Sequence, residues 1–252
     1  MKLLMHTCCA PCSVYCIDAL KEEGIEPTIY WYNPNIHPYM EYKARRDTLK
    51  EYAESLNLNA IFEEDYGLDD FCKNVVGDLQ NRCKNYCYPV RLRKTFEYAK
   101  ENGYDAVTTT LLYSIYQNHD FIKEYMEKLS EEFGIEFLYR DFRVGFREGQ
   151  NKARELGLYM QKYCGCIFSE EDRYSKLISL AKRTAKQVQR SHVDAELDPM
   201  TNDERKVIHK ALGNWHNIRT DSEGVGSDRH ICIRYVADTE EAETAEEVQT
   251  QE

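Results

Sequence analysis

The sequence predicts an α/β protein: a parallel, Rossmann-like sheet with helices on both faces, followed by a small α+β domain. Short apolar runs alternate with amphipathic segments over residues 1–180, which is the pattern of strand–helix–strand units in a parallel sheet. A polar stretch over 182–196 then precedes a compact unit at 199–236. With 252 residues and 42% apolar residues, the chain is long enough for one large and one small domain.

The first unit contains five candidate strands and five candidate helices. Gly24 ends the first helix, and Asn33-Pro34 ends the second strand. We expect the strands at 3–5, 28–32, 60–62, 106–110 and 136–139. We expect the helices, from their apolar spacing, at 13–23, 40–56, 89–101, 119–133 and 148–156.

The strand order expected for this unit is 3-2-1-4-5, with the reversal between the first and fourth strands. Ligands bind such sheets beyond the carboxyl ends of the strands, at the point where the order reverses. The segment Cys8–Cys12 follows the first strand directly, and Thr108–Thr110 ends the fourth. The two segments are therefore expected to be neighbours at one crevice.

The second unit is expected to be a separate domain. The expected division is a metal-binding domain at 1–180, a linker at 181–196, a domain at 197–236 and a disordered acidic tail at 237–252. Thr201–Glu204 resembles a helix N-terminus with approximate capping-box spacing. A strand is expected at 229–235, after a turn at Ser222–Gly224.

Charge and hydropathy limit the partners. The net charge of −11 does not by itself point to nucleic-acid binding, although the acidic tail, which has no basic residue, accounts for much of it. No run of 18 apolar residues is present, so no membrane span is expected. Cysteines interrupt the N-terminal apolar stretch, which argues against a signal peptide and predicts a cytoplasmic protein with reduced thiols.

Seven of the ten cysteines fall in three clusters, which is too many for one tetrahedral zinc. The clusters are Cys8, Cys9 and Cys12; Cys83 and Cys87; and Cys164 and Cys166. They suit an iron–sulfur cluster with a second centre beside it. A thioredoxin-like redox pair at Cys9 and Cys12 is the alternative, and the further clustered cysteines weaken it.

The seven clustered cysteines are three more than a [4Fe–4S] cluster needs, so we expect two metal sites. Four of them complete the ligand set of a [4Fe–4S] cluster, and we assign these as Cys9, Cys12, Cys83 and Cys87. The three others are assigned to a mononuclear iron: Cys8, Cys164 and Cys166. Cys9 and Cys12 lie at a predicted helix N-terminus with Pro11 in its first turn, where the helix dipole favours thiolates. The isolated cysteines, which are Cys16, Cys72 and Cys232, are expected to be core residues.

Residues 1 to about 175 closely resemble the QueH family of cobalamin-independent epoxyqueuosine reductases. The resemblance rests on six segments: His6–Cys12, Tyr32–Pro38, Arg82–Leu92, Thr108–Gln117, Asp141–Gln150 and Leu156–Arg173. Ile115 departs from the expected pattern, in which proline stands in this loop.

This resemblance implies reduction of epoxyqueuosine to queuosine at the wobble position of tRNAs with GUN anticodons. It also implies a [4Fe–4S] cluster next to a single iron, and electrons from an external donor. Tyrosines and a histidine near the crevice can stack on a base or donate a proton, although ordinary packing also explains such residues. The candidate catalytic residues are Tyr113, Tyr116, Gln117 and His37.

Residues 197–236 resemble an R-three-H domain of the Jag-like type. Its signature is the pair Arg205 and His209, followed by Ser222–Gly224 and Arg229. An arginine and a histidine four residues apart share one helix face. The resemblance implies binding of single-stranded nucleic acid through Arg205, His209 and Arg229.

Two other functions remain open from the residues alone. A non-catalytic RNA-binding protein with structural zinc would need only four of the cysteines and would be colourless. A PP-loop-like thiolase acting on tRNA would share the α/β layout. It would, however, carry a phosphate loop of the SGGxDS type after the first strand, where this chain has HTCCAPC.

Overall fold

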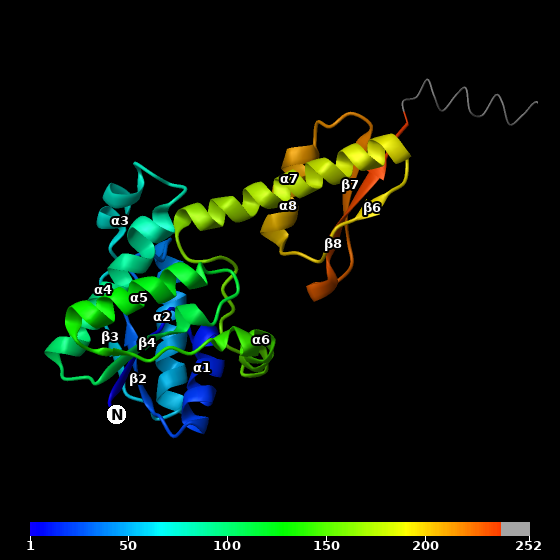
Figure 1. Ribbon diagram of the computed structural model, residues 1–252. Helices are drawn as coiled ribbons and strands as arrows, with labels where there is room; N and C mark the ends of the chain where they lie inside the picture. Colours follow the sequence, from blue (N-terminus) through cyan, green and yellow to red (C-terminus); the bar gives the residue numbers. More distant parts are fainter. Residues whose placement is uncertain (238–252) are drawn as a thin grey trace, which may run out of the picture. The chain divides into compact units, whose positions relative to one another are not determined.

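The computed structural model describes residues 1–237, which form two compact units divided between Phe168 and Ser169 (Figure 1). The expected acidic tail lies, from residue 238 onward, outside the described residues. Across residues 1–237, no helix is both long enough and apolar enough to cross a membrane.

The first unit is built on a five-stranded parallel sheet in the order β3-β2-β1-β4-β5, which confirms the expected order. The central strand β1 pairs with β2 on one side and β4 on the other, so that Leu3 lies opposite both Pro27 and Ala106. All four side chains of β1 are buried, as expected for a parallel strand covered on both faces. The strands are β1 (Leu3–His6), β2 (Pro27–Trp31), β3 (Ala60–Phe62), β4 (Ala106–Thr109) and β5 (Glu136–Phe137).

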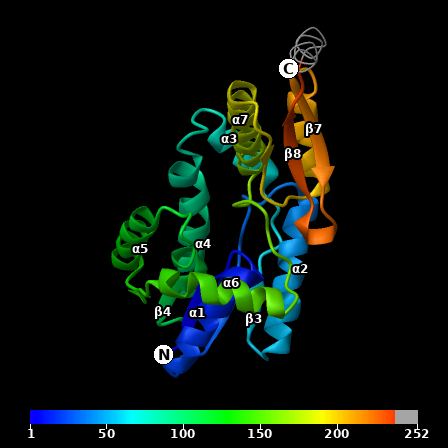
Figure 2. The ribbon, with the colours of Figure 1, turned by 90° about the vertical axis from the view of Figure 1, so that its right-hand side faces the viewer.

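Helices cover both faces of this sheet. Helices α1 and α2 lie together on one face, as expected for right-handed crossovers between parallel strands. Helix α4 connects β3 to β4 and lies on the other face, against β1 and β4 (Figure 2). The helices are α1 (Ala10–Glu22), α2 (Tyr39–Ser55), α3 (Leu68–Val75), α4 (Tyr88–Glu101), α5 (His119–Phe133) and α6 (Phe146–Glu155). Shorter helical turns lie between them: η1 (Cys83–Cys87), η2 (Thr110–Leu112) and η3 (Phe142–Gly145).

The expected crevice lies between the ends of β1 and β4. The Nδ1 atom of His6 lies 2.9 Å from Oγ1 of Thr109, which links the last residues of the two strands. One step further on, the backbone N–H of Cys8 donates to Oγ1 of Thr110 at 3.2 Å. The first cysteine cluster therefore lies at the point where the strand order reverses, which is the usual ligand site of such sheets.

The second unit is a three-stranded antiparallel sheet in the order β6-β8-β7 with two helices. Its elements are the greater part of α7 (Ile167–Ser191), β6 (Ala195–Glu196), α8 (Asn202–Leu212), β7 (Ile218–Glu223), η4 (Gly226–Asp228) and β8 (His230–Tyr235). Thr201 and Glu204 form a complete capping box at the start of α8. The core joins Ile208 and Leu212 of α8 to Ile231 and Ile233 of β8.

The linker expected at 181–196 is instead helix and strand. Helix α7 continues to Ser191, and β6 follows at Ala195. Ala181, Ala185 and Val188 recur at helical spacing and are buried in the core of the second unit. Two of these three are alanines among polar neighbours, so the sequence gives little sign of an apolar face.

Candidate functional site

The first thiol group comprises Cys8, Cys9 and Cys12, whose sulfurs all lie within 4.8 Å of one another. Cys9 is the N-cap of α1, and Pro11 stands in its first turn, as expected from the sequence. Proline fits this position because the first helical N–H groups have no partner within the helix. The positive end of the helix dipole therefore faces the group and favours negative charge on it.

The three thiols share protons. The pKa of Cys8 is held well below its usual range, because the thiols of Cys12 and Cys9 donate hydrogen bonds to its sulfur. Burial raises the pKa of Cys9, and the hydrogen bond to Cys8 raises that of Cys12. The group thus accepts one negative charge readily. Further deprotonation requires a cation bound to the sulfurs.

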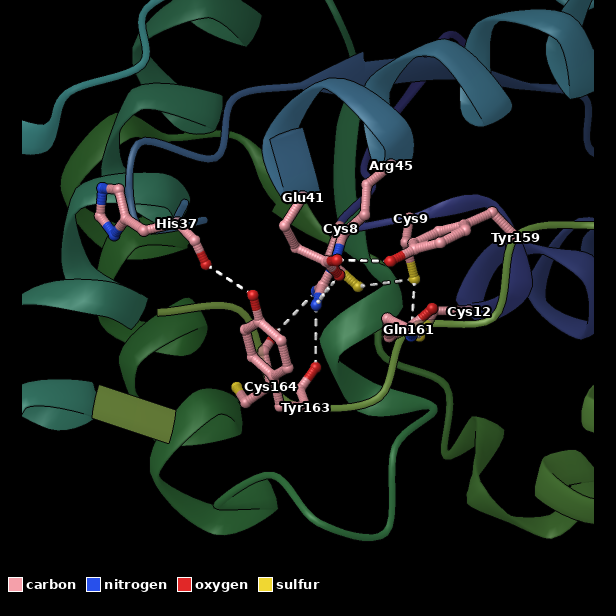
Figure 3. A network of polar contacts seen from close by, with 10 residues as sticks. All are labelled: Cys8, Cys9, Cys12, His37, Glu41, Arg45, Tyr159, Gln161, Tyr163 and Cys164. Atoms are coloured by element: carbon pink, nitrogen blue, oxygen red, sulfur yellow. Dashed lines mark hydrogen bonds and ion pairs between the residues drawn. The ribbon is translucent and has the colours of Figure 1, made fainter. Parts of the chain in front are cut away.

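Gln161 supplies hydrogen bonds to this group (Figure 3). Its Nε2 donates to Sγ of Cys9 at 3.0 Å and lies 3.4 Å from Sγ of Cys12. The hydroxyl of Thr110 likewise lies 3.5 Å from Sγ of Cys8. Amide and hydroxyl donors directed at sulfur are suited to thiolates that ligate a metal, whose charge they stabilise.

The second thiol group comprises Cys83, Cys87, Cys164 and Cys166. Cys83 and Cys87 are the first and last residues of the π-helical turn η1, and a hydrogen bond between their thiols, together with burial, raises the pKa of Cys87. Cys166 adds to that shift, and both Cys83 and Cys166 interact with the thiol of Cys164, which is an exposed residue. These four thiols therefore lie close enough to one another to interact electrostatically.

Arg45 fixes the loop that supplies Cys164 and Cys166 (Figure 3). Its guanidinium donates to the carbonyl oxygens of Cys164 and Tyr163, each at 2.9 Å, and to Glu41 at 2.7 Å. The Arg45 side chain is only 2% exposed. Since a buried guanidinium is costly without such partners, the loop and Arg45 stabilise each other.

The glycine between Cys164 and Cys166 is required by this packing. A Cβ atom at Gly165 would lie 3.2 Å from Cγ1 of Ile36 and 3.4 Å from Nη1 of Arg45, and the φ angle of Gly165 is +154°. On the other side of the loop, the backbone N–H of His37 donates to the carbonyl of Gly165 at 2.8 Å. The loop is therefore held from both sides.

The grouping differs from the division expected from the sequence, which joined Cys9 and Cys12 to Cys83 and Cys87, and Cys8 to Cys164 and Cys166. Cys8 lies with Cys9 and Cys12, because all three belong to the start of α1 or to the residues immediately preceding it. The loop of Cys164 and Cys166 is fixed instead beside η1. Counting ligands gives the totals of four and three, whereas which thiols lie near one another depends on the fold.

His37 lies beside the site but its ring points into an aromatic pocket. The ring centroid is 4.6 Å from that of Phe71 and 5.2 Å from that of Tyr66. Burial lowers the pKa of His37 to about 4. The imidazole is therefore neutral at physiological pH and poorly suited to donate a proton.

The three other candidate catalytic residues have different environments. Tyr113 is fully buried, and its hydroxyl donates to the carbonyl of Phe146 at 2.8 Å. Tyr116 is 81% exposed. Gln117 lies beside the second thiol group, with its Nε2 donating to Sγ of Cys164 at 3.4 Å. Of these, Gln117 contacts a candidate metal ligand, and Tyr116 is free to meet a large substrate.

Tyr88, which the sequence marks only as one of several tyrosines expected near the crevice, also belongs to the site. Its hydroxyl donates to Oε1 of Gln117 at 2.8 Å and accepts from the backbone N–H of Asn118 at 3.2 Å. Burial raises the pKa of Tyr88 to about 12, so the phenol remains protonated and orients Gln117. The sequence signal for Tyr88 is its place directly after Cys87. For Gln161, the corresponding signal is its place three residues before Cys164.

The nucleic-acid residues expected in the second unit are mainly engaged within it. Arg205 is 8% exposed and donates to the carbonyl of Met200 at 2.7 Å. The two ring nitrogens of His209 lie 2.7 Å and 2.9 Å from the hydroxyls of Thr220 and Ser222 on β7. Arg229 is exposed.

Comparisons with known proteins identify the family of each part of the chain. The family model "Epoxyqueuosine reductase QueH" matches residues 3–172, and the model of the R-three-H domain matches residues 175–235. A curated protein from Dehalococcoides mccartyi, named Epoxyqueuosine reductase QueH, is 36% identical over 175 residues, which cover 69% of this chain and 96% of that protein. A protein of the same name from Thermotoga maritima is 31% identical over 191 residues, covering 72% of this chain and 96% of its own.

Solved structures are less similar. The U34-tRNA thiolase NcsA of Methanococcus maripaludis with its [4Fe-4S] cluster aligns over 90% of this chain and 76% of its own, at 11% identity and a TM-score of 0.45. A similarity this low supports no argument about the site.

Proposed function

We propose that this chain, which belongs to the epoxyqueuosine reductase QueH family and also contains an R-three-H domain, reduces epoxyqueuosine to queuosine at the wobble position of tRNAs with GUN anticodons. The observation that supports this best is the convergence of seven thiols beside the switch point of the sheet. Thiols that stay reduced and ligate iron fit a cytoplasmic enzyme.

We propose that the first thiol group holds a single iron and the second a [4Fe–4S] cluster. Metal–sulfur bonds of about 2.3 Å to one tetrahedral ion place the sulfurs about 3.8 Å apart. The sulfurs of Cys8, Cys9 and Cys12, within 4.8 Å of one another, fit one ion after a small closure. The four thiols of a [4Fe–4S] cluster each bind a different iron, so Cys83 and Cys87, whose thiols are hydrogen-bonded to each other, would separate when the cluster binds. The second group has the matching number, and soft thiolates suit both centres.

The reaction removes one oxygen atom from the substrate and consumes two electrons and two protons, with release of water. The iron centres would supply Lewis acidity toward the epoxide oxygen and electrons received singly from an external one-electron carrier. The protein holds these ligands in place through Arg45 and Gln161, and excludes water from the buried sulfurs of Cys9 and Cys12. Tyr88 holds the amide of Gln117 beside Cys164.

Tyr116 is the proposed contact for the nucleoside. It lies next to Gln117 in the chain, is 81% exposed, and its ring meets Phe146 edge-on at 5.8 Å between centroids. An exposed aromatic ring so placed can stack on an unpaired anticodon base. His37 and Tyr113, whose side chains are buried in the packing, are proposed to support the site rather than to transfer protons.

The alternative functions fit less well. A structural zinc would leave the second thiol group and the donors to sulfur unexplained. An ATP-using thiolase would place a phosphate loop at the N-terminus of α1, where this chain has three cysteines.

The test is anaerobic purification followed by assay on tRNA that contains epoxyqueuosine, with a low-potential one-electron reductant. We expect a brown protein with more than four irons per chain, and conversion to queuosine, seen as the loss of one oxygen atom in nucleoside mass spectra. A tRNA without a GUN anticodon serves as the control. Failure of the iron-loaded protein to convert the modified tRNA would contradict the proposal.

Removal of the second unit is expected to leave the metal centres intact. All seven clustered cysteines precede Ser169, and the Dehalococcoides relative has little chain beyond the matched segment. A chain ending at Tyr174 should therefore retain its iron and reduce a short anticodon stem-loop, but bind whole tRNA more weakly. The loss should be larger at low salt, where phosphate contacts contribute most.

A chain ending at Ala237 is the control for this deletion, because it removes seven acidic residues but keeps the R-three-H domain. If the two shortened chains bind tRNA equally well, the second unit contributes nothing to affinity. Loss of iron from the chain ending at Tyr174 would show that the first unit depends on the second.

A further inference from the structure

Helix α7 contains a basic stretch that the proposed reductase site does not use. Residues 173–193 include six lysines and arginines and no acidic residue, in a chain whose net charge is −11. The basic residues are Arg173, Lys176, Lys182, Arg183, Lys186 and Arg190. Such a run in an acidic protein indicates a surface for a polyanion.

The folded helix gathers part of this charge on one face. Successive residues of an α-helix are 100° apart, so Arg183, Lys186 and Arg190 lie within about 60° of one another, opposite the buried residues. The buried face consists of Ala181, Ala185 and Val188. Lys182 lies at the edge of the outer face, and all four basic residues are exposed. We call Lys182, Arg183, Lys186 and Arg190 the basic face.

Acidic partners neutralise most other arginines of the second unit but not this face. Arg173 is paired with Glu204, Arg219 with Asp221, and Arg234 with Asp194. Within residues 1–237, no ion pair involves a member of the basic face. The positive potential of the face is therefore available to a ligand.

An aromatic pair lies just beyond the end of α7. His192 follows the helix and is exposed, and its ring stacks on that of Tyr235 at 4.0 Å between centroids, with an angle of 14°. Arg205 and His209, by contrast, direct their polar groups to Met200, Thr220 and Ser222 within the fold. The cations on α7 are thus available to a backbone of phosphates, and the outer face of the exposed His192 ring, beyond the end of the helix, is available to a base.

We propose that the basic face binds the phosphate backbone of single-stranded RNA, with His192 stacking on a base. The rise of 1.5 Å per residue places Arg183 and Arg190 about 10 Å apart along the helix, enough to contact two or three successive phosphates. This assigns the RNA affinity of the second unit to the helix face rather than to the Arg205 and His209 pair. The proposal deepens the proposed tRNA binding, but it does not depend on reductase activity.

The test compares the full iron-loaded chain with the triple variant R183Q/K186Q/R190Q. The probe is a fluorescent single-stranded oligoribonucleotide of a dozen nucleotides, and binding is measured by anisotropy from 50 to 250 mM KCl. The matched control is K21Q/K50Q/K128Q, which removes equal charge from exposed lysines in the later turns of α1, α2 and α5. Equal thermal unfolding temperatures establish that both variants are folded.

Loss of three phosphate contacts on a single strand is expected to reduce the slope of log K against log salt by about 2. The ratio of wild-type to variant affinity should thus be more than tenfold larger at 50 mM than at 200 mM KCl. The control should change the slope by less than half a unit. If the triple variant keeps the slope and affinity of the control, the proposal is overturned. It is also overturned if Arg205→Gln, with an unchanged thermal unfolding temperature, reduces the slope while the triple variant does not.

Discussion

Replacing Cys87 by serine is expected to remove roughly four irons per chain and the broad visible absorbance of the cluster, and to reduce epoxyqueuosine turnover to background. Cys87 is buried between Cys83 and Arg91, whose Nε donates to the carbonyl of Cys87 at 2.6 Å. A serine there keeps the size and the helical turn but replaces a soft thiolate by a hydroxyl that ligates iron poorly. Iron analysis, the optical spectrum and the tRNA assay measure the three effects.

Cys12→Ser is the matched comparison, because Cys12 belongs to the other thiol group. This variant should lose about one iron per chain and its activity, yet keep the cluster absorbance. Cys16→Ser, a buried cysteine of the same helix outside both groups, should keep its iron. If Cys12→Ser loses the cluster absorbance and Cys87→Ser keeps it, the assignment of the two groups is reversed. If either variant keeps full turnover, the site is not the one proposed.

Much of the first unit follows from the sequence because its strands and helices alternate regularly. The strand order and the position of the first cysteine cluster at the switch point are confirmed. Local signals are strong here: Pro11 and the cysteines at the start of α1, and Gly24 after its end, which has φ +75°. Each of these signals depends on residues that are close in the sequence, and such local patterns can be recognised without the structure.

The features that the sequence does not reveal depend on long-range contacts. The second half of α7 resembles a linker in sequence because its inner face is formed by small alanines, whose burial is decided by the sheet they meet. Every second residue of β7 faces the core, which places Ile218, Thr220 and Ser222 on that face. Thr220 and Ser222 are polar at these positions because their hydroxyls are hydrogen-bonded to the ring of His209. Gln161 reaches the sulfurs of residues about 150 positions away, which no spacing rule predicts.

The role of Arg45 in the site likewise depends on long-range contacts that the sequence does not reveal. Replacing Arg45 is expected to have a large effect on both stability and cluster content. By sequence alone it is one of several arginines suited to a phosphate. In the structure it is buried and donates to Glu41 and to the carbonyls of Tyr163 and Cys164. Glu41 in turn accepts from the hydroxyl of Tyr159, so one ion pair ties α2 to both ends of the 159–164 segment.

Arg45→Met is expected to destabilise the first unit by about 3–5 kcal/mol, because it leaves Glu41 buried without its cation. It also frees the two carbonyls, so the loop of Cys164 and Cys166 loses its position beside η1. We therefore expect loss of the cluster absorbance and of activity even at low temperature, where the variant remains folded. The iron of the first thiol group should be retained, because Cys8, Cys9 and Cys12 are placed by α1.

Arg46→Met is the matched control on the next residue, whose ion pairs with Asp47 and Glu64 lie nearer the surface. Such exposed pairs contribute about 0–1 kcal/mol, so this variant should keep its iron and activity. Arg45→Lys separates charge from geometry: a single ammonium can pair with Glu41 but cannot reproduce the planar fork that reaches both carbonyls. It should recover stability more than cluster content. If Arg45→Lys and Arg45→Met retain the full cluster, the 163–166 loop is positioned by other contacts, and Arg45 serves only the fold.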